Sequence, residues 1–176
     1  VGYGCLARNL QALLAPFRSR ISAYDPWLTD AQVLAGGATP ASLDELMARS
    51  QIVFVLAIPT RENKAMITRA HLERIPKGSV FVLMSRAHVV DFEALTDLAL
   101  QDRFRVAIDV FPQEPLPANH PIRSAPRAVF SAHRAGAVRD DLRLIGRMVA
   151  DDLEAMGRGL PPWRMQRSEP ELVRRL

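Results

Sequence analysis

The stretch Gly2-Tyr3-Gly4-Cys5-Leu6-Ala7 at the start of the chain decides the fold. It has the form G-x-G-x-x-A, which is typical of a strand that turns tightly into a helix and holds a dinucleotide pyrophosphate there. Gly2 would permit the turn, Gly4 would let phosphates approach the backbone, and Ala7 would keep the helix close to the sheet. Unpaired N–H groups at the helix start would then face the phosphate charge.

An acidic residue, Asp25, follows these glycines at roughly the 20-residue spacing of such sites. A carboxylate at this position can bind both hydroxyls of the adenosine ribose and would repel a 2′-phosphate. The pair of features therefore favours NAD over NADP. The glycines alone leave an alternative open, because small residues in a strand–helix turn also serve close packing without any ligand.

Size and composition indicate a single globular domain. The chain has 176 residues, of which 48% are hydrophobic and 24% charged. No apolar run approaches the roughly 20 residues of a membrane span, and no secretory signal opens the chain, so we expect a cytoplasmic protein without a membrane partner. The single cysteine, Cys5, excludes an internal disulfide and leaves no metal-ligand cluster.

The net charge of +4 does not by itself indicate a nucleic-acid partner. The arginines are scattered, with no basic block and no interleaved aromatic residues. An anionic cofactor and substrate explain the positive balance equally well. We therefore expect no nucleic-acid binding.

The chain begins at Val1, without methionine and one residue before the first motif glycine. A strand should precede that glycine, so we expect a fragment cut inside or just before this strand. Residues 1–137 are predicted to form a nucleotide-binding domain. Residues 138–176 are predicted to form a helix and a proline- and arginine-rich tail that packs on something absent.

Hydrophobic patterning predicts alternating strands and helices, which argues for an α/β fold with a doubly wound parallel sheet. The run Ile52–Ile58 suits a strand buried on both faces. Segment 28–40 is predicted to be a loop with at most a weak helix, and Phe111–Pro121 a proline-rich loop. Strands are predicted over residues 21–24, 52–58, 79–84, 106–108 and 128–131, and helices over residues 5–17, 42–47, 68–75, 91–99 and 138–157.

Polar residues follow four of the predicted strands: Asp25, Ser85-Arg86, Asp109 and His133. Ligands of a parallel sheet gather at the carboxyl ends of its strands, so these residues are candidates for one site. The alternative is that strand ends begin turns, and turns are polar.

Several ordered motifs resemble the D-isomer-specific 2-hydroxyacid dehydrogenases. They are the glycine motif with Tyr24-Asp25-Pro26, then Pro59–Asn63, Ser85–Asp91, Ile108–Pro117 and Ser131–Gly136. The resemblance covers residues 1 to about 157. It implies a Rossmann-like NAD-binding domain whose substrate domain is mostly absent, and a homodimer formed through the NAD-binding domain. The helix and tail of residues 138–176 would return to the missing substrate domain.

The resemblance also implies catalytic roles. Arg86 matches the arginine that grips the carboxylate of a 2-hydroxy or 2-oxo acid and polarises the reacting carbonyl, for which a permanently charged, bidentate guanidinium is suited. His133 matches the acid/base, since the pKa of an unperturbed imidazole lies near working pH. Glu114 matches the carboxylate that orients this histidine and favours its protonated form.

The cofactor contacts implied by the resemblance are more numerous. Cys5 and Leu6 would lie over the pyrophosphate. The full set of expected cofactor residues is Gly2, Gly4, Cys5, Leu6, Asp25, Ala57, Ile58, Pro59, Asn63, Met84, Ser85, Arg86, Asp109, His133 and Gly136. No metal is expected.

Other residues match the family less well. His71, His88 and His120 match no catalytic position and are interpreted as surface or packing residues. Ala87 stands where the family has glycine, and Leu83 where it often has a polar residue; both could alter the nicotinamide pocket or substrate choice.

The sequence therefore predicts an NAD-dependent enzyme that moves hydride to or from C2 of a small 2-hydroxy/2-oxo acid, inactive or poorly active as this fragment. Two alternatives stay open. One is a non-enzymatic, corepressor-like NAD sensor on the same scaffold, which would not need all three of Arg86, Glu114 and His133. The other, which the later motifs do not support, is a nucleotide-binding methyltransferase.

Overall fold

The computed structural model describes residues 1–166, 170 and 174. They form two compact units, Val1–Ala132 and His133–Leu176, which are described separately below. The sequence had placed the end of the nucleotide-binding domain at residue 137.

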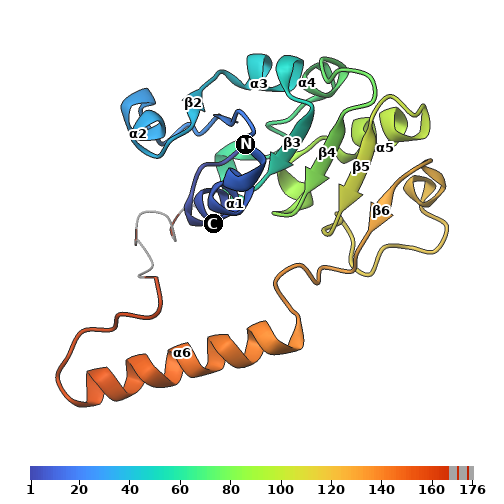
Figure 1. The fold of residues 1–176 in the computed structure, drawn as a ribbon. Helices are drawn as coiled ribbons and strands as arrows, with labels where there is room; N and C mark the ends of the chain where they lie inside the picture. Colours follow the sequence, from blue (N-terminus) through green and yellow to red (C-terminus); the bar gives the residue numbers. More distant parts are fainter. Residues whose placement is uncertain (167–169, 171–173, 175–176) are drawn as a thin grey trace. The chain divides into compact units, whose positions relative to one another are not determined.

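The first unit contains six short parallel strands in two hydrogen-bonded groups (Figure 1). β1 (Ser22–Ala23) pairs with β2 (Thr39–Pro40). The second group has the order β3-β4-β5-β6. Its strands are β3 (Ile52–Val55), β4 (Val80–Leu83), β5 (Arg105–Ile108) and β6 (Val129–Phe130). The all-parallel pairing confirms the predicted sheet type.

Val1 and Gly2 join the two groups of strands. The Val1 nitrogen donates to the Phe54 carbonyl at 2.8 Å, and the Leu56 nitrogen donates to the Val1 carbonyl at 2.8 Å. On the other side, the Gly2 nitrogen donates to the Tyr24 carbonyl at 2.8 Å. The chain thus starts between β1 and β3, runs outward to β2, and returns to β3 on the other side of Val1.

Helices make the crossovers between the strands. They are α1 (Cys5–Leu14), α2 (Asp30–Ala35), α3 (Leu43–Arg49), α4 (Arg69–Glu73) and α5 (Phe92–Leu100), with 3-10 turns at Ala15–Phe17, Arg61–Asn63, Ala87–Val89 and Pro121–Ser124. Crossovers between parallel strands are right-handed, so the outward α1 and α2 and the returning α3, α4 and α5 cover opposite faces. This is the doubly wound, Rossmann-like arrangement that the sequence predicts.

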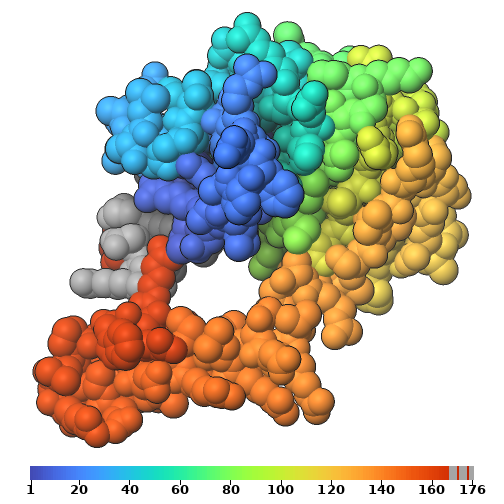
Figure 2. Space-filling model, viewed as in Figure 1, coloured from blue at the N-terminus to red at the C-terminus, as the bar shows by residue number. Residues whose placement is uncertain are grey.

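The main core lies between the sheet and α3, α4 and α5. Val53 and Val55 of β3 and Phe81 and Leu83 of β4 are almost fully buried there. The other face is covered less completely, because α1 has no buried residue and lies on the surface of the unit in dark blue (Figure 2). Ile52 is accordingly 54% exposed, and Ile58, beyond the end of β3, is 37% exposed. The prediction that Ile52–Ile58 is buried on both faces is wrong at these two residues.

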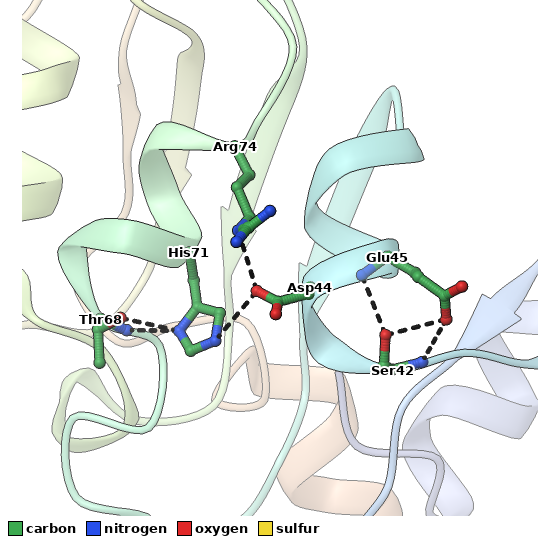
Figure 3. A network of polar contacts seen from close by, with 6 residues as sticks. All are labelled: Ser42, Asp44, Glu45, Thr68, His71 and Arg74. Carbon is green, nitrogen blue, oxygen red and sulfur yellow. Dashed lines mark hydrogen bonds and ion pairs between the residues drawn. The ribbon is translucent and has the colours of Figure 1, made fainter.

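Side chains fix where the returning helices begin. Ser42 and Glu45 form a capping box at the start of α3, and this start lies within the helix predicted over residues 42–47: the Glu45 nitrogen donates to Ser42 Oγ at 3.2 Å, and the Ser42 nitrogen donates to Glu45 Oε2 at 3.1 Å (Figure 3). The backbone and hydroxyl hydrogen bonds from Ser42 hold the pKa of Glu45 below its usual value. Asp91 caps α5 by accepting from the Ala94 nitrogen at 3.0 Å.

A polar contact links α3 to α4 (Figure 3). Asp44 Oδ1 lies 3.0 Å from Arg74 Nε and 3.7 Å from His71 Nε2. The other ring nitrogen of His71 accepts from the Thr68 nitrogen at 3.1 Å, so the ring hydrogen of neutral His71 lies on Nε2, toward Asp44. His71 is thus a packing residue, as predicted.

Some element boundaries differ from the predictions. α1 gives way to a 3-10 turn at Ala15, because Pro16 has no N–H to continue the helix. The predicted loop 28–40 contains α2, capped by Thr29, and the two-residue strand β2. β3 ends at Val55 rather than at Ile58, and Leu56, the next residue, still donates its N–H to the Val1 carbonyl.

The second unit consists of the predicted long helix and the described part of its tail. α6 (Arg139–Gly157) is followed by a turn in which Asp152 accepts three consecutive backbone N–H groups, those of Trp163 and Arg164 at 2.8 Å and of Met165 at 2.9 Å. This segment of the tail therefore packs on its own helix. The rest of the predicted tail, 167–169, 171–173 and 175–176, lies outside the described residues.

Candidate functional site

The turn after Val1 requires glycine at position 2. Gly2 has a φ of +81°, a left-handed conformation that disfavours a side chain, and a Cβ there would lie 2.5 Å from the Ala57 nitrogen. The backbone therefore passes directly over the end of β3. Because the chain leaves Val1 toward β1 and later returns to β3, this turn lies at the topological switch point, where open α/β sheets bind ligands.

The start of α1 is open. Gly4 is its N-cap, no side chain caps the helix, and its first turn has no acidic residue. A Cβ on Gly4 would meet no atom of the protein within 4 Å, so packing does not explain this glycine. Cys5 and Leu6 in the first turn are both exposed. The space and the free N–H groups suit an anionic ligand such as a pyrophosphate.

Asp25 lies beside this turn and contacts it. Its Oδ2 accepts from the Tyr3 nitrogen at 2.8 Å, and its Oδ1 accepts from the Trp27 nitrogen at 3.0 Å. Each carboxylate oxygen retains a lone pair for a ribose hydroxyl. Asp25 thus both fixes the G-x-G turn and lines a pocket of about 310 Å³ with Ala23, Tyr24, Leu28, Asp30, Val33, Pro40, Ala41, Ser42 and Glu45.

The loop after β3 carries Ala57, Ile58, Pro59 and Asn63. Asn63 is buried, its Nδ2 donates to the Ile58 carbonyl at 2.7 Å, and its Oδ1 accepts from the Thr60 nitrogen at 2.8 Å. These bonds shape the loop around Pro59. The expected contacts of all four residues with a cofactor stay predictions.

Arg86 follows β4 at the same carboxyl edge of the sheet. Its guanidinium is exposed and donates to the Ser85 carbonyl at 2.7 Å, and the described residues place no carboxylate within ion-pair distance of it. Ser85 is buried, and its hydroxyl has no hydrogen-bond partner among the described residues. An unpaired, exposed cation beside an unsatisfied hydroxyl suits an anionic ligand with polar groups.

Two carboxylates follow β5. Asp109 is 2% exposed, and the Ser131 hydroxyl, at the end of β6, donates to it. Glu114 lies in the proline-rich loop, where its Oε1 accepts from the Phe111 nitrogen at 2.9 Å. The first unit therefore places Asp25, Ser85, Arg86 and Asp109 at the carboxyl ends of its strands, as predicted.

His133 and Gly136 belong to the second unit. His133 is its first residue and has a φ of +53°, a left-handed conformation that is uncommon outside glycine. Such conformations are found disproportionately at functional sites. The convergence of His133 with Arg86 and Glu114 stays a prediction.

Comparison with known proteins identifies the family. Residues 1–135 match the NAD-binding domain of the D-isomer-specific 2-hydroxyacid dehydrogenases. The chain belongs to this family.

The chain is similar to several members of the dehydrogenase family, and it covers only part of the length of each. A phosphoglycerate oxidoreductase from Rhizobium etli superposes with a TM-score of 0.84 and is 39% identical, over 96% of this chain and 51% of its own. The glyoxylate reductase of Thermofilum pendens is 31% identical over 92% of this chain and 49% of its own length. The D-3-phosphoglycerate dehydrogenase of Archaeoglobus fulgidus is 25% identical over 92% of this chain and 31% of its own.

This chain therefore spans about half the length of the first two relatives and about a third of the last.

The two departures from the dehydrogenase pattern lie in the core. Leu83 is completely buried and Ala87 is 6% exposed, and both belong to the main hydrophobic cluster. Their side chains therefore pack inside the unit.

His88 makes a contact that sequence reasoning missed. Its Nε2 lies 2.9 Å from the Thr60 carbonyl, so the ring joins the loops after β3 and β4. Its position two residues after Arg86 was the only available signal. His120 accepts from the Ile122 nitrogen at 3.2 Å and packs edge-on against Phe92, which is the structural role that the sequence predicts.

Two further features are absent from the described residues. No helix among them has the length and apolarity to cross a bilayer. Nor do the described histidine, cysteine and acidic residues gather in a group of three that could hold a metal ion.

Proposed function

We propose that the chain is the cofactor-binding half of an NAD-dependent oxidoreductase that moves hydride to or from C2 of a small 2-hydroxy/2-oxo acid. The observation that carries the proposal is the switch-point turn. At this turn Gly4, which packing does not explain, is the N-cap of α1, and no side chain caps this helix. The turn lies beside the pocket that Asp25 lines. Family membership and the exposed Arg86 guanidinium at the same sheet edge support it.

The residues present fit NAD. Gly4, Cys5 and Leu6 would hold the pyrophosphate through backbone N–H groups, and Asp25 would accept from the adenosine ribose. Its charge disfavours a 2′-phosphate, so we propose NAD rather than NADP. Met84, Ser85 and Asp109 would contact the nicotinamide end, where the unsatisfied hydroxyl of Ser85 gains a partner. When bound, the cofactor supplies or accepts the hydride.

The chain's own side chains would bind and orient the acid. Arg86 would hold its carboxylate and polarise the C2 carbonyl, which concentrates positive charge where negative charge develops in the transition state. His133 would donate a proton to the resulting alkoxide oxygen, or accept it in the reverse direction. Glu114 would hold the His133 ring in the productive orientation and favour its protonated form.

The experiment is a turnover assay on protein carrying the complete coding sequence. NADH is mixed with a panel that includes glyoxylate and other small 2-oxo acids, and absorbance at the NADH band is followed. Loss of absorbance with at least one acid is expected, and Arg86→Gln should lower kcat/KM about a hundredfold or more. NAD binding without turnover on any acid would instead favour the corepressor-like alternative.

We also propose the homodimer that the family resemblance implies. Light scattering of the same protein after size exclusion should give twice the mass of one subunit. A monomer at micromolar concentration would contradict it.

A further inference from the structure

His88 joins two loops of the candidate site. It lies in the 3-10 turn Ala87–Val89, directly after Arg86 and Ala87, and its Nε2 is 2.9 Å from the Thr60 carbonyl. A carbonyl only accepts, so the imidazole must donate from Nε2. This side-chain bond runs from the loop after β4 to the loop after the neighbouring strand β3.

The acceptor of this bond is firmly held. Thr60 is 2% exposed, and its nitrogen donates to Asn63 Oδ1 at 2.8 Å. Asn63 in turn donates to the Ile58 carbonyl at 2.7 Å. A force on the Thr60 carbonyl is therefore transmitted to Ile58 and Pro59, which are expected cofactor contacts.

Backbone bonds align the same two segments farther along the chain. The Ala65 nitrogen donates to the His88 carbonyl at 2.8 Å, and the Ile67 nitrogen donates to the Val89 carbonyl at 3.0 Å. Both bonds lie farther along the chain than Thr60 in the segment after β3, and farther than Arg86 in the segment after β4. The bond from the His88 ring to Thr60 lies closer to both the cofactor loop and Arg86 than these two backbone bonds do.

We propose that His88 is a positioning residue that fixes the Ala57–Asn63 loop against the segment carrying Arg86. The inference rests on the proposed function, since it assigns to His88 the alignment of the cofactor loop with the carboxylate-binding arginine. The ring acts through the Thr60 carbonyl and does not contact the ligands. Its loss should therefore weaken NAD binding through loop disorder, with no charge removed from the site.

The test compares NAD affinity, by calorimetry, in the 176-residue chain and in its variants. His88→Ala should bind NAD roughly five- to tenfold more weakly, the effect of losing one neutral hydrogen bond. His88→Gln should stay within about twofold of wild type, because the glutamine amide nitrogen reaches the position of Nε2 and donates to the same carbonyl. Histidine-ring NMR of the wild type should show the Nε2-protonated form of neutral His88.

His71→Ala is the matched control. The His71 ring also makes a hydrogen bond to backbone, as the acceptor from the Thr68 nitrogen, but it lies in α4 and contacts Asp44 of α3. This variant should lose stability and keep wild-type NAD affinity. The contrast separates loop positioning from a general loss of fold.

The outcomes are distinguishable. A wild-type chain that does not bind NAD overturns the proposed function, and this inference with it. Wild-type binding with equal affinity in His88→Ala overturns the inference alone, even if the variant melts earlier. A glutamine variant as weak as the alanine variant also overturns it.

Discussion

The backbone of Gly2 passes so close to Ala57 that a Cβ on Gly2 would lie 2.5 Å from the Ala57 nitrogen. This contact brings the first turn over the end of β3 and places the cofactor loop beside it. The glycine is thus required by the fold itself, whereas Gly4, two residues later, is not.

Gly2→Ala should destabilise the chain. The variant combines a left-handed φ with a backbone clash, which together should lower the free energy of unfolding by roughly 2–4 kcal/mol. Denaturant titration measures this loss. Gly78→Ala is the control, since Gly78 has a similar φ of +84° and open space around it; its loss should be about 1 kcal/mol. Equal losses in the two variants would contradict the close approach as the cause.

Gly4→Ala should spare the fold and impair ligand binding. The added Cβ meets no protein atom, so the free energy of unfolding should change by less than about 1 kcal/mol. It would occupy the space proposed for the pyrophosphate, and NAD affinity measured by calorimetry should fall about tenfold or more. Unchanged affinity would place the pyrophosphate elsewhere.

Asp25→Asn should affect both stability and cofactor choice. An amide offers one acceptor oxygen, so its NH₂ would face one of the N–H groups of Tyr3 and Trp27 at a cost of about 1–2 kcal/mol. Loss of the charge should also raise the affinity ratio of NADP to NAD, about tenfold. Asp30→Asn is the control, because Asp30 lines the same pocket but makes neither backbone bond. Competition binding of the two cofactors measures the ratio.

Acid should release the tail from α6 in the second unit. Burial acts to raise the pKa of Asp152, but the N–H groups of Arg164, Trp163 and Met165 outweigh it and hold the pKa below the ordinary 3.8. A depressed pKa stabilises the folded form above the unfolded value and loses that effect as pH falls through the folded value. Trp163 fluorescence, in a Trp27→Phe background, should stay constant from pH 7 to about 4 and change at lower pH.

Asp152→Asn provides the comparison for this pH series. An asparagine does not titrate, so its Trp163 emission should show no transition at low pH. A transition of the same size in both proteins would assign the change to another group.

The parts of the fold that depend on local chemistry were predictable. Ser42 with Glu45, and Asp91, cap their helices through residues three positions away, and such signals are visible in the string. β2 was missed because Thr39–Pro40 is too short to show alternation. It exists because its backbone pairs with Ser22 and Ala23, which are distant in sequence.

The site was predictable by residue type but not by contact. Asp25 was expected to bind a ribose, yet its bonds to the Tyr3 and Trp27 nitrogens depend on how the first turn folds over β1. The bond from His88 to Thr60 likewise joins residues 28 positions apart that share no motif. Tertiary geometry alone brings such pairs together.

The junction at Val1 and Gly2 has a further consequence for ligands. Asp25 follows β1 of the two-stranded group and Arg86 follows β4 of the four-stranded group. Among the described residues, only the backbone hydrogen bonds of Val1 and Gly2 tie the two groups of strands together. A dinucleotide would reach both groups and add a second connection between them. AMP would touch only one, so NAD should sharpen the melting transition of this unit and AMP should not.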